Sequence, residues 1–146
     1  VFMSEFIRLD NQLCFPLYVL SRQITGFYRP LLESLELTYP QYLVMMVLWE
    51  REIVTVKQLG QLLWLDSGTL TPLLKRMEAN GLLTRKRSVD DERSVDIALT
   101  EKGRQLEKEA EKIPAHIKCH IKMSDYEIVT LREYLKKILS ATTENE

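Results

Sequence analysis

Residues 66–80 read DSGTLTPLLKRMEAN, and this stretch decides the fold. Leu70, Leu73, Leu74 and Met77 recur at the spacing of one helical face, which predicts that this face is buried. Asp66 and its neighbours have turn and cap chemistry, and Gly81 is a natural stop. Pro72 leaves two starts open for the helix, one near Asp66 in spite of the proline and one at Thr71.

The opposite face of this helix is suited to approach DNA. Small residues let a helix come close to a groove, hydroxyls can bond phosphates or base edges, and cations neutralise phosphate. The helix start is itself a good phosphate seat. We expect the contacts here to come from Asp66, Ser67, Thr69, Thr71, Pro72, Lys75 and Arg76.

The flanking elements complete a recognisable order. Residues 11–35 predict a long helix and residues 39–50 a central buried one, which a capping box of Thr38 with Gln41 opens. Thr55 with Gln58 forms a second capping box, which opens a short helix. After residue 81, two short strand-like runs at 82–87 and 95–99 predict a β-hairpin. Thr100 caps a further helix, with Pro114 interrupting or bending it, and Ser124 with Glu127 opens a last one. A short helix, a turn, a second helix and a hairpin form a winged helix-turn-helix, so the fold class is mainly α with a small β wing.

Charge is local rather than global. The chain of 146 residues has a net charge of −1, which by itself does not indicate nucleic-acid binding. Between Lys75 and Arg93, however, six residues are basic and four are acidic. The hairpin contributes candidate contacts, with Arg93 placed to enter a minor groove and the preceding acidic residues placed to brace it. These candidates are Arg85, Lys86, Arg87, Asp91 and Arg93. The alternative is an ordinary amphipathic helix followed by an ordinary charged hairpin.

The two cysteines and the hydropathy bear on location. Cys14 and Cys119 are too few for a disulfide-stapled secreted domain. No apolar run is long enough to span a bilayer, and the first residues lack the pattern of a secretory signal. The expectation is a cytoplasmic chain without a membrane partner.

Two sets of motifs resemble one family. Residues 65–78 (LDSGTLTPLLKRME) and 90–93 (DDER) are similar to the MarR family, and closest to its organic-hydroperoxide-sensing branch, the OhrR-type repressors. The resemblance covers residues 13 to about 139. It implies a homodimer on a pseudo-palindromic double-stranded operator, with no cofactor. It also favours Asp66 as the start of the recognition helix, with Pro72 tolerated inside it.

The resemblance also implies a domain layout. Residues 1–146 would form a single MarR-type domain, with 39–99 as the winged helix-turn-helix lobe. Residues 10–35 and 100–141 would supply the helices of the dimer interface.

A second signature, residues 13–18 (LCFPLY) with Tyr28 and residues 37–42 (LTYPQY), implies a redox sensor. In this branch the cysteine at the position of Cys14 reacts with the peroxide, and tyrosines at the positions of Tyr28 and Tyr39 hydrogen-bond to it. A thiolate is the reactive form, and phenol hydroxyls favour it. Oxidation gives a sulfenic acid that a second thiol traps as a disulfide, and the repressor then releases its operator. The alternative is an inert cysteine among ordinary core tyrosines.

Helix geometry constrains this site. Cys14 and Tyr18 share a face, but Tyr28 lies fourteen residues beyond Cys14, or roughly 21 Å along a straight helix. Unless the helix breaks, a contact between Tyr28 and Cys14 needs Tyr28 of the other subunit. The site is therefore expected at a dimer interface.

Cys119 matches the branch members that resolve the sulfenic acid as an intersubunit disulfide. A spectator thiol is the alternative. His116, Cys119 and His120 have workable ligand spacing on one helical turn, but a fourth metal ligand is not evident, and no metal site is predicted. Two further functions compete: a regulator of this fold that responds to a small phenolic ligand or a metal, and a thiol peroxidase. The peroxidase is disfavoured because the basic hairpin would go unexplained, so the chain is not expected to be an enzyme.

Overall fold

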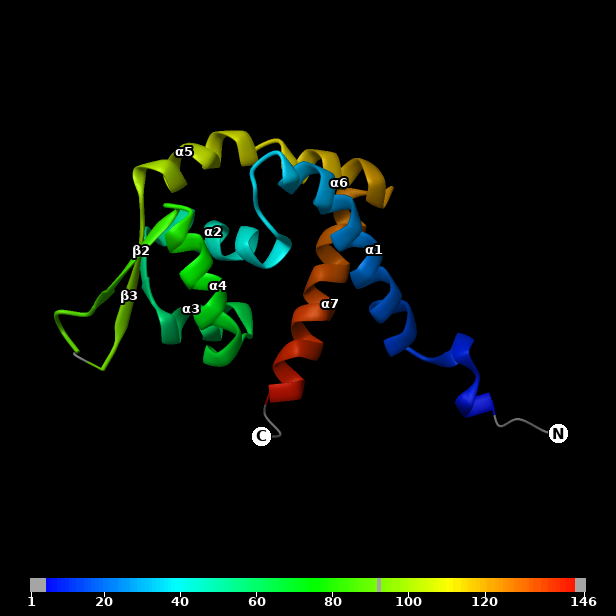
Figure 1. The fold of residues 1–146 in the computed structure, drawn as a ribbon. Helices are drawn as coiled ribbons and strands as arrows, with labels where there is room; N and C mark the ends of the chain where they lie inside the picture. Colours follow the sequence, from blue (N-terminus) through cyan, green and yellow to red (C-terminus); the bar gives the residue numbers. More distant parts are fainter. Residues whose placement is uncertain (1–4, 92, 144–146) are drawn as a thin grey trace. The chain divides into compact units, whose positions relative to one another are not determined.

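The computed structural model describes residues 5–91 and 93–143 (Figure 1). These residues divide between two compact units, Val1–Ile113 and Pro114–Glu146, which we describe separately. The first unit contains two short 3-10 helices, η1 (Glu5–Ile7) and η2 (Leu9–Asn11), followed by α1 (Cys14–Glu33), α2 (Tyr39–Arg51), β1 (Ile53–Thr55), α3 (Val56–Leu63), α4 (Ser67–Ala79), β2 (Leu83–Arg87), β3 (Val95–Leu99) and α5 (Glu101–Ala110).

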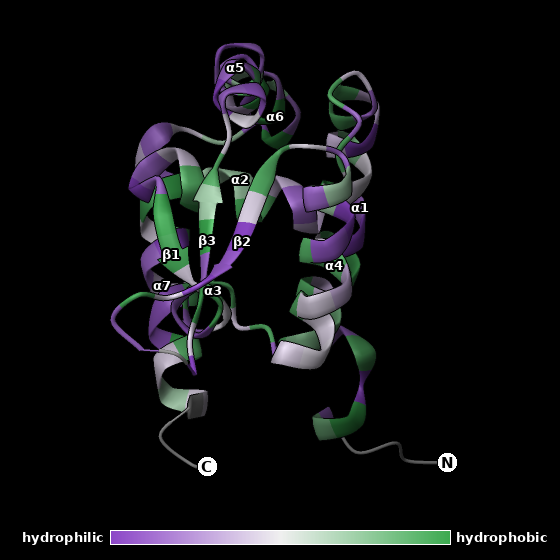
Figure 2. Ribbon diagram, turned by 60° about the vertical axis from the view of Figure 1, so that its left-hand side comes forward, coloured by the Kyte–Doolittle hydropathy of each residue, from purple (hydrophilic) through white to green (hydrophobic). Residues whose placement is uncertain are grey.

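The strands form an antiparallel three-stranded sheet in the order β1–β3–β2. The predicted hairpin is confirmed, with Arg85 opposite Ile97 in its register. β1 was not predicted, because a run of three residues is too short to show a period. It forms because β2 pairs with only one edge of β3, and β1 pairs with the other edge. There Val54 pairs with Ile97, and both side chains are buried. Figure 2 shows the hydrophobic colour on β1 and β3, and the hydrophilic colour on the part of β2 that leads to the hairpin tip.

Side-chain caps determine where the helices begin. At α2, the backbone N–H of Thr38 donates to Gln41 Oε1 at 2.9 Å, and Pro40 occupies the first turn. At α3, Thr55 and Gln58 exchange reciprocal bonds of 2.9 and 3.1 Å. Both predicted capping boxes are therefore confirmed, and each satisfies backbone donors that have no partner inside the helix.

The core of this unit surrounds α2. Val44, Met45 and Leu48 are fully buried on α2, as are Leu59 on α3 and Leu70 and Met77 on α4. α3 contacts both α2 and α4. The prediction of a central helix over 39–50 is confirmed.

α4 begins where the sequence favoured it. Asp66 is the N-cap, Ser67 is the first helical residue, and Pro72 lies inside the helix. Proline has no N–H to give to the carbonyl of Gly68 four residues before it, and the loss is tolerable because Gly68 is exposed. Gly81 follows the helix with a φ of 74°, the left-handed conformation that glycine adopts without steric cost.

α5 is joined closely to the rest of this unit. Thr100 caps it by accepting a bond from the Gly103 N–H at 3.0 Å. The indole Nε1 of Trp49 on α2 donates to the Gly103 carbonyl at 2.9 Å. A side chain at Gly103 would meet the carbonyl oxygen of Leu82 and the Cδ1 of Leu99, so this glycine allows a close approach of backbone segments.

The second unit contains α7 (Asp125–Thr143) and all of α6 (Ile113–Ile121) except its first residue, which belongs to the first unit. Pro114 interrupts the helical stretch, as one of the two predicted outcomes, and lies in the first turn of α6. Ser124 and Glu127 form the third capping box, with the Ser124 N–H donating to Glu127 Oε2 at 2.9 Å. The fold class, mainly α with a small β wing, is confirmed. Within the described ranges, no helix has both the length and the apolar character needed to cross a membrane.

Candidate functional site

α4 has a sharp division between its faces. Leu70, Leu74 and Met77 are buried, while the residues proposed to face DNA are exposed. The structure therefore places hydroxyls and cations together on one outer surface, which we call the α4 outer face. It consists of Ser67, Thr69, Thr71, Pro72, Lys75 and Arg76.

The carboxylate of Asp66 is hydrogen-bonded to Thr69, in the first turn of α4. Its Oδ1 accepts the Thr69 N–H at 2.8 Å and its Oδ2 accepts the Thr69 hydroxyl at 3.2 Å. These bonds from Thr69 stabilise the carboxylate and hold the pKa of Asp66 below its usual range. Asp66 therefore starts the helix and fixes the Thr69 side chain, rather than presenting a free carboxylate.

The hairpin tip is held by Asp91. Its Oδ1 accepts the backbone N–H of Arg93 at 3.0 Å, and its carbonyl accepts the N–H of Ser94 at 2.8 Å. An acidic residue thus braces the segment that carries Arg93, through the backbone. Glu92, counted among the acidic residues of the hairpin, lies outside the described residues. Lys86 and Arg87 are exposed at the end of β2.

Arg85 differs from the other hairpin cations because it is half-buried and paired. Its Nη2 lies 2.8 Å and its Nε 2.9 Å from Glu78 Oε2. The sequence pointed to Arg85 as a DNA contact, whereas its guanidinium faces back toward α4.

A cleft of about 500 Å³ lies between α3, α4 and the hairpin. Thr71, Arg85 and Arg93 line it, together with Lys57 at the start of α3. Lys57 was not among the predicted contacts. The apolar spacing of α3 predicts which face of this helix is buried, but it does not predict what the opposite face contacts. Its cation adds to the positive charge beside the α4 outer face.

Cys14 is the first residue of α1 and is an exposed free thiol. Leu13 and Phe15 beside it are also exposed, which gives the thiol apolar neighbours. Tyr18, one turn later, is exposed and lies under the Arg22 guanidinium, 5.5 Å from the ring centroid.

Tyr28 and Tyr39 lie together but away from Cys14. Their ring centroids are 4.8 Å apart, and Tyr28 also contacts Tyr42 at 5.9 Å. α1 is continuous from Cys14 to Glu33, so Tyr28 is roughly 21 Å along the same helix from the thiol. Within one chain the structure thus brings the two tyrosines together without the cysteine.

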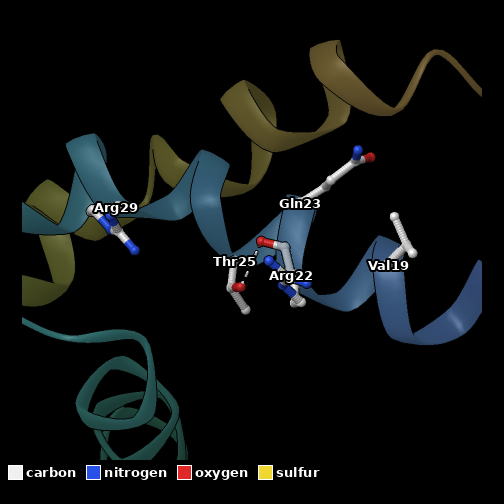
Figure 3. A pocket seen from close by; sticks show the side chains of 5 residues that line it. All are labelled: Val19, Arg22, Gln23, Thr25 and Arg29. Atoms are coloured by element: carbon white, nitrogen blue, oxygen red, sulfur yellow. Dashed lines mark hydrogen bonds between the residues drawn. The ribbon is translucent and has the colours of Figure 1, made fainter.

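A second hollow of about 470 Å³ runs along α1 and is shown in Figure 3. The residues lining it are Val19, Arg22, Gln23, Thr25 and Arg29, which include no thiol and no phenol. The Thr25 hydroxyl is engaged by its own helix, since it donates to the Arg22 carbonyl at 3.0 Å. This hollow is therefore separate from the tyrosine pair.

Cys119 is an exposed free thiol on α6. His120 Nδ1 lies 2.8 Å from the His116 carbonyl oxygen, so that ring is oriented along its own helix. Across residues 5–91 and 93–143, no three His, Cys, Asp or Glu side chains gather as a metal site would require.

Burial of the tyrosine pair leads to a test in alkaline solution. Desolvation, with the neighbouring phenols, raises the pKa of Tyr28 to about 12, and burial also raises the pKa of Tyr39. The unfolded chain therefore loses these protons at a lower pH than the folded one, so stability should fall as pH rises from about 10 to 12. Thermal melts across this range should show a smaller loss in Tyr28→Phe. Tyr126→Phe, at a residue 80% exposed, should leave the loss unchanged, and equal curves for all three proteins would contradict the assignment.

Comparisons with known proteins agree with this geometry. Residues 26–110 match the family described as transcriptional regulator SarA/Rot. The organic hydroperoxide resistance transcriptional regulator of Bacillus subtilis (strain 168) is 53% identical over 135 residues, or 92% of each chain. The structure of reduced AbfR bound to DNA has a TM-score of 0.79 at 37% identity and is matched over 95% of this chain and 97% of that one. The structure of disulfide-formed AbfR, a protein of Staphylococcus epidermidis, has a TM-score of 0.66 at 38% identity, over 92% and 95%.

Proposed function

Because the chain belongs to the SarA/Rot-type, MarR-like family of winged-helix transcriptional regulators, we propose that it is a repressor that senses organic hydroperoxides. It binds a pseudo-palindromic operator as a homodimer and releases it when Cys14 is oxidised. The observation that carries the redox part is an exposed thiol at the start of an unbroken helix that also bears Tyr28.

The α4 outer face is the proposed reader of the major groove. It combines exposed hydroxyls near the helix start with Lys75 and Arg76 one to two turns later. The hairpin is the proposed second contact, with Arg93 at a tip that Asp91 holds in place. Two contacts of this kind, set at a fixed angle, are how winged helices obtain specificity beyond phosphate attraction.

Exposed apolar residues support a homodimer. On or before α1, large apolar side chains remain exposed in the single chain, and a second set is exposed along α7. Surfaces of this kind mark protein–protein contacts. The first set is Leu9, Leu13, Phe15, Leu20 and Phe27, and the second is Val129, Leu131, Tyr134, Ile138 and Leu139.

The proposed sensor is shared between subunits. Since Tyr28 lies roughly 21 Å along α1 from Cys14 of its own chain and Tyr39 of α2 packs against Tyr28, the tyrosine pair of one subunit would serve the thiol of the other. The Tyr28 phenol is protonated at neutral pH and can donate a hydrogen bond to a thiolate, and burial, which raises its pKa, extends that range into alkaline solution.

The chemistry is a two-electron oxidation. The Cys14 thiolate attacks the distal oxygen of the hydroperoxide, the O–O bond breaks, and the alkoxide takes a proton and leaves as an alcohol. The resulting sulfenic acid then reacts with the Cys119 thiol of the partner subunit, forming an S–S bond and releasing water. The leucine and phenylalanine beside Cys14 favour an organic over an inorganic peroxide.

Operator release is tested with DNA that the protein itself selects. A duplex chosen from a random-sequence library by the reduced chain should lose about 5- to 150-fold in affinity after a small excess of cumene hydroperoxide, as fluorescence anisotropy would measure. Cys14→Ser should bind the same duplex and not respond. Release from Cys14→Ser on oxidation would exclude Cys14 as the sensor, and release by a phenolic acid without any oxidant would favour a ligand-responsive regulator.

The fate of the oxidised sulfur is a separate prediction. After hydroperoxide treatment, non-reducing electrophoresis should show a dimer-sized band that is absent from both Cys14→Ser and Cys119→Ser. A band that persists in Cys119→Ser would show that another thiol resolves Cys14. Loss of DNA binding without any dimer band, in the presence of a small thiol, would assign that role to the small thiol.

A further inference from the structure

Glu78 and Arg85 join α4 to the hairpin through three contacts. Besides the two guanidinium contacts, Glu78 Oε1 accepts the backbone N–H of Arg85 at 3.0 Å. Their side chains are only 35% and 27% exposed, so the pair is partly shielded from solvent. A carboxylate that binds both the backbone and the guanidinium of one residue fixes that residue in position and direction.

The turn between them is held independently of this pair. The Leu82 N–H donates to the Met77 carbonyl at 3.0 Å, and the Thr100 hydroxyl donates to the Gly81 carbonyl at 2.7 Å. Removing the Glu78 carboxylate should therefore leave the helix, the turn and the sheet formed. What it should change is how firmly the middle of β2 is held against α4.

The middle of β2 is the point from which the DNA-facing part of the hairpin extends. Arg85 pairs with Ile97 at the centre of the ladder, and Lys86 and Arg87 follow toward the tip. Arg85 and Arg93 both line the cleft beside Thr71 of α4. The position of Arg85 thus bears on the spacing between the α4 outer face and the tip.

We propose that Glu78 is a positioning residue for sequence-specific DNA binding, holding the hairpin at the angle at which α4 and Arg93 engage the same operator. The proposal rests on the proposed DNA-binding function. Non-specific binding depends on charge alone, whereas specific binding needs both contacts at once in fixed geometry. Glu78 should therefore affect the ratio of specific to non-specific affinity.

The test compares two duplexes, one selected by the wild-type chain from a random library and one of scrambled sequence. Glu78→Ala should lower the specific-to-non-specific affinity ratio about 10-fold, the loss expected when one of two coupled recognition elements is misplaced. If the Glu78 carboxylate merely repelled DNA, its removal would raise the affinities for both duplexes by the same factor. The ratio of specific to non-specific affinity would then stay constant. Glu109→Ala is the matched control, because it removes the same charge from an exposed position on α5, outside both the hairpin and the α4 outer face, and should leave the ratio unchanged.

A double-mutant cycle tests positioning directly. Arg93→Ala should lower affinity for the selected duplex about 10-fold in the wild-type background. In the Glu78→Ala background it should lower this affinity less than about 3-fold, because Arg93 of a misplaced tip contributes less to binding. Glu78→Gln retains an acceptor for the Arg85 N–H and should restore part of the ratio, which also covers the case in which the alanine variant folds poorly. Additive effects of Glu78→Ala and Arg93→Ala, or an unchanged ratio, would overturn the inference. Failure of the wild-type chain to select any sequence would instead overturn the proposed function.

Discussion

Replacing Lys75 and Arg76 together by alanine should lower affinity for the selected duplex by about 100-fold at moderate salt while leaving the fold intact. Both side chains are exposed on the α4 outer face, whereas Leu74 before them and Met77 after them are buried. Each cation lost removes a phosphate contact, and the slope of log affinity against log salt should fall by about 1.8 per subunit. Anisotropy titrations at several salt concentrations measure both quantities.

The control removes the same charge elsewhere. Lys108→Ala with Lys112→Ala changes the end of α5 and the residues after it, and α5 lies on the side of the first unit opposite α3 (Figures 1 and 2). This variant should change affinity by less than about 3-fold, as expected from long-range charge alone. Equal losses in the two variants would mean that net charge, and not the α4 outer face, governs binding.

The second large effect concerns stability. Gly103→Ala should lower the free energy of unfolding by about 3 kcal/mol, the upper part of the range for overpacking a close contact. The new Cβ would overlap the Leu82 carbonyl oxygen and lie 2.9 Å from Leu99 Cδ1. Backbone must move, which disturbs the bond from Trp49 to the Gly103 carbonyl and the entry into α5. The melting temperature should fall by about 10 °C, measured by circular dichroism at one protein concentration.

Gly26→Ala is the matched control, because a Cβ there meets nothing within 4 Å. Gly26 lies inside α1, where alanine is the better helix former by about 0.5–1 kcal/mol, so this variant should melt at the same or a higher temperature. A drop in Gly26→Ala as large as that in Gly103→Ala would show that the loss does not arise from the Leu82 contact.

The elements predicted from the sequence were those with local signals. Capping boxes at Thr38 and Thr55, the apolar period of α4 and the glycine at position 81 each depend on residues within one or two turns, and the structure confirms them. β1 depends instead on an edge of β3, some forty residues away. Three residues are too few to show the alternation of apolar and polar side chains that predicts a strand, so β1 is seen only in the tertiary structure.

The candidate site was predictable in outline but not in the roles of its polar residues. The sequence placed Asp66 at the start of the helix and Arg85 on the first strand of the hairpin, and the structure has both there. Their contact with DNA stays a prediction. The sequence could not show that Glu78 would bind Arg85, or that Asp66 would be used by Thr69, since both depend on side-chain directions set by a turn. Likewise, the sequence could not show that Lys57 lines the same cleft as Arg85 and Arg93, because this depends on how α3 packs beside the hairpin.

The charges of Asp66 and Tyr28 determine whether a change in pH could affect α4 or the tyrosine pair. The bonds from Thr69 keep the Asp66 carboxylate, which starts α4, charged well into the acid range, and the Tyr28 phenol stays neutral until far into the alkaline range. Neither group therefore changes charge between about pH 5 and 9. In the proposed function, a change in acidity therefore would not alter the charge of the helix cap at Asp66 or of the Tyr28 phenol, so neither group would convert acidification into a loss of DNA binding.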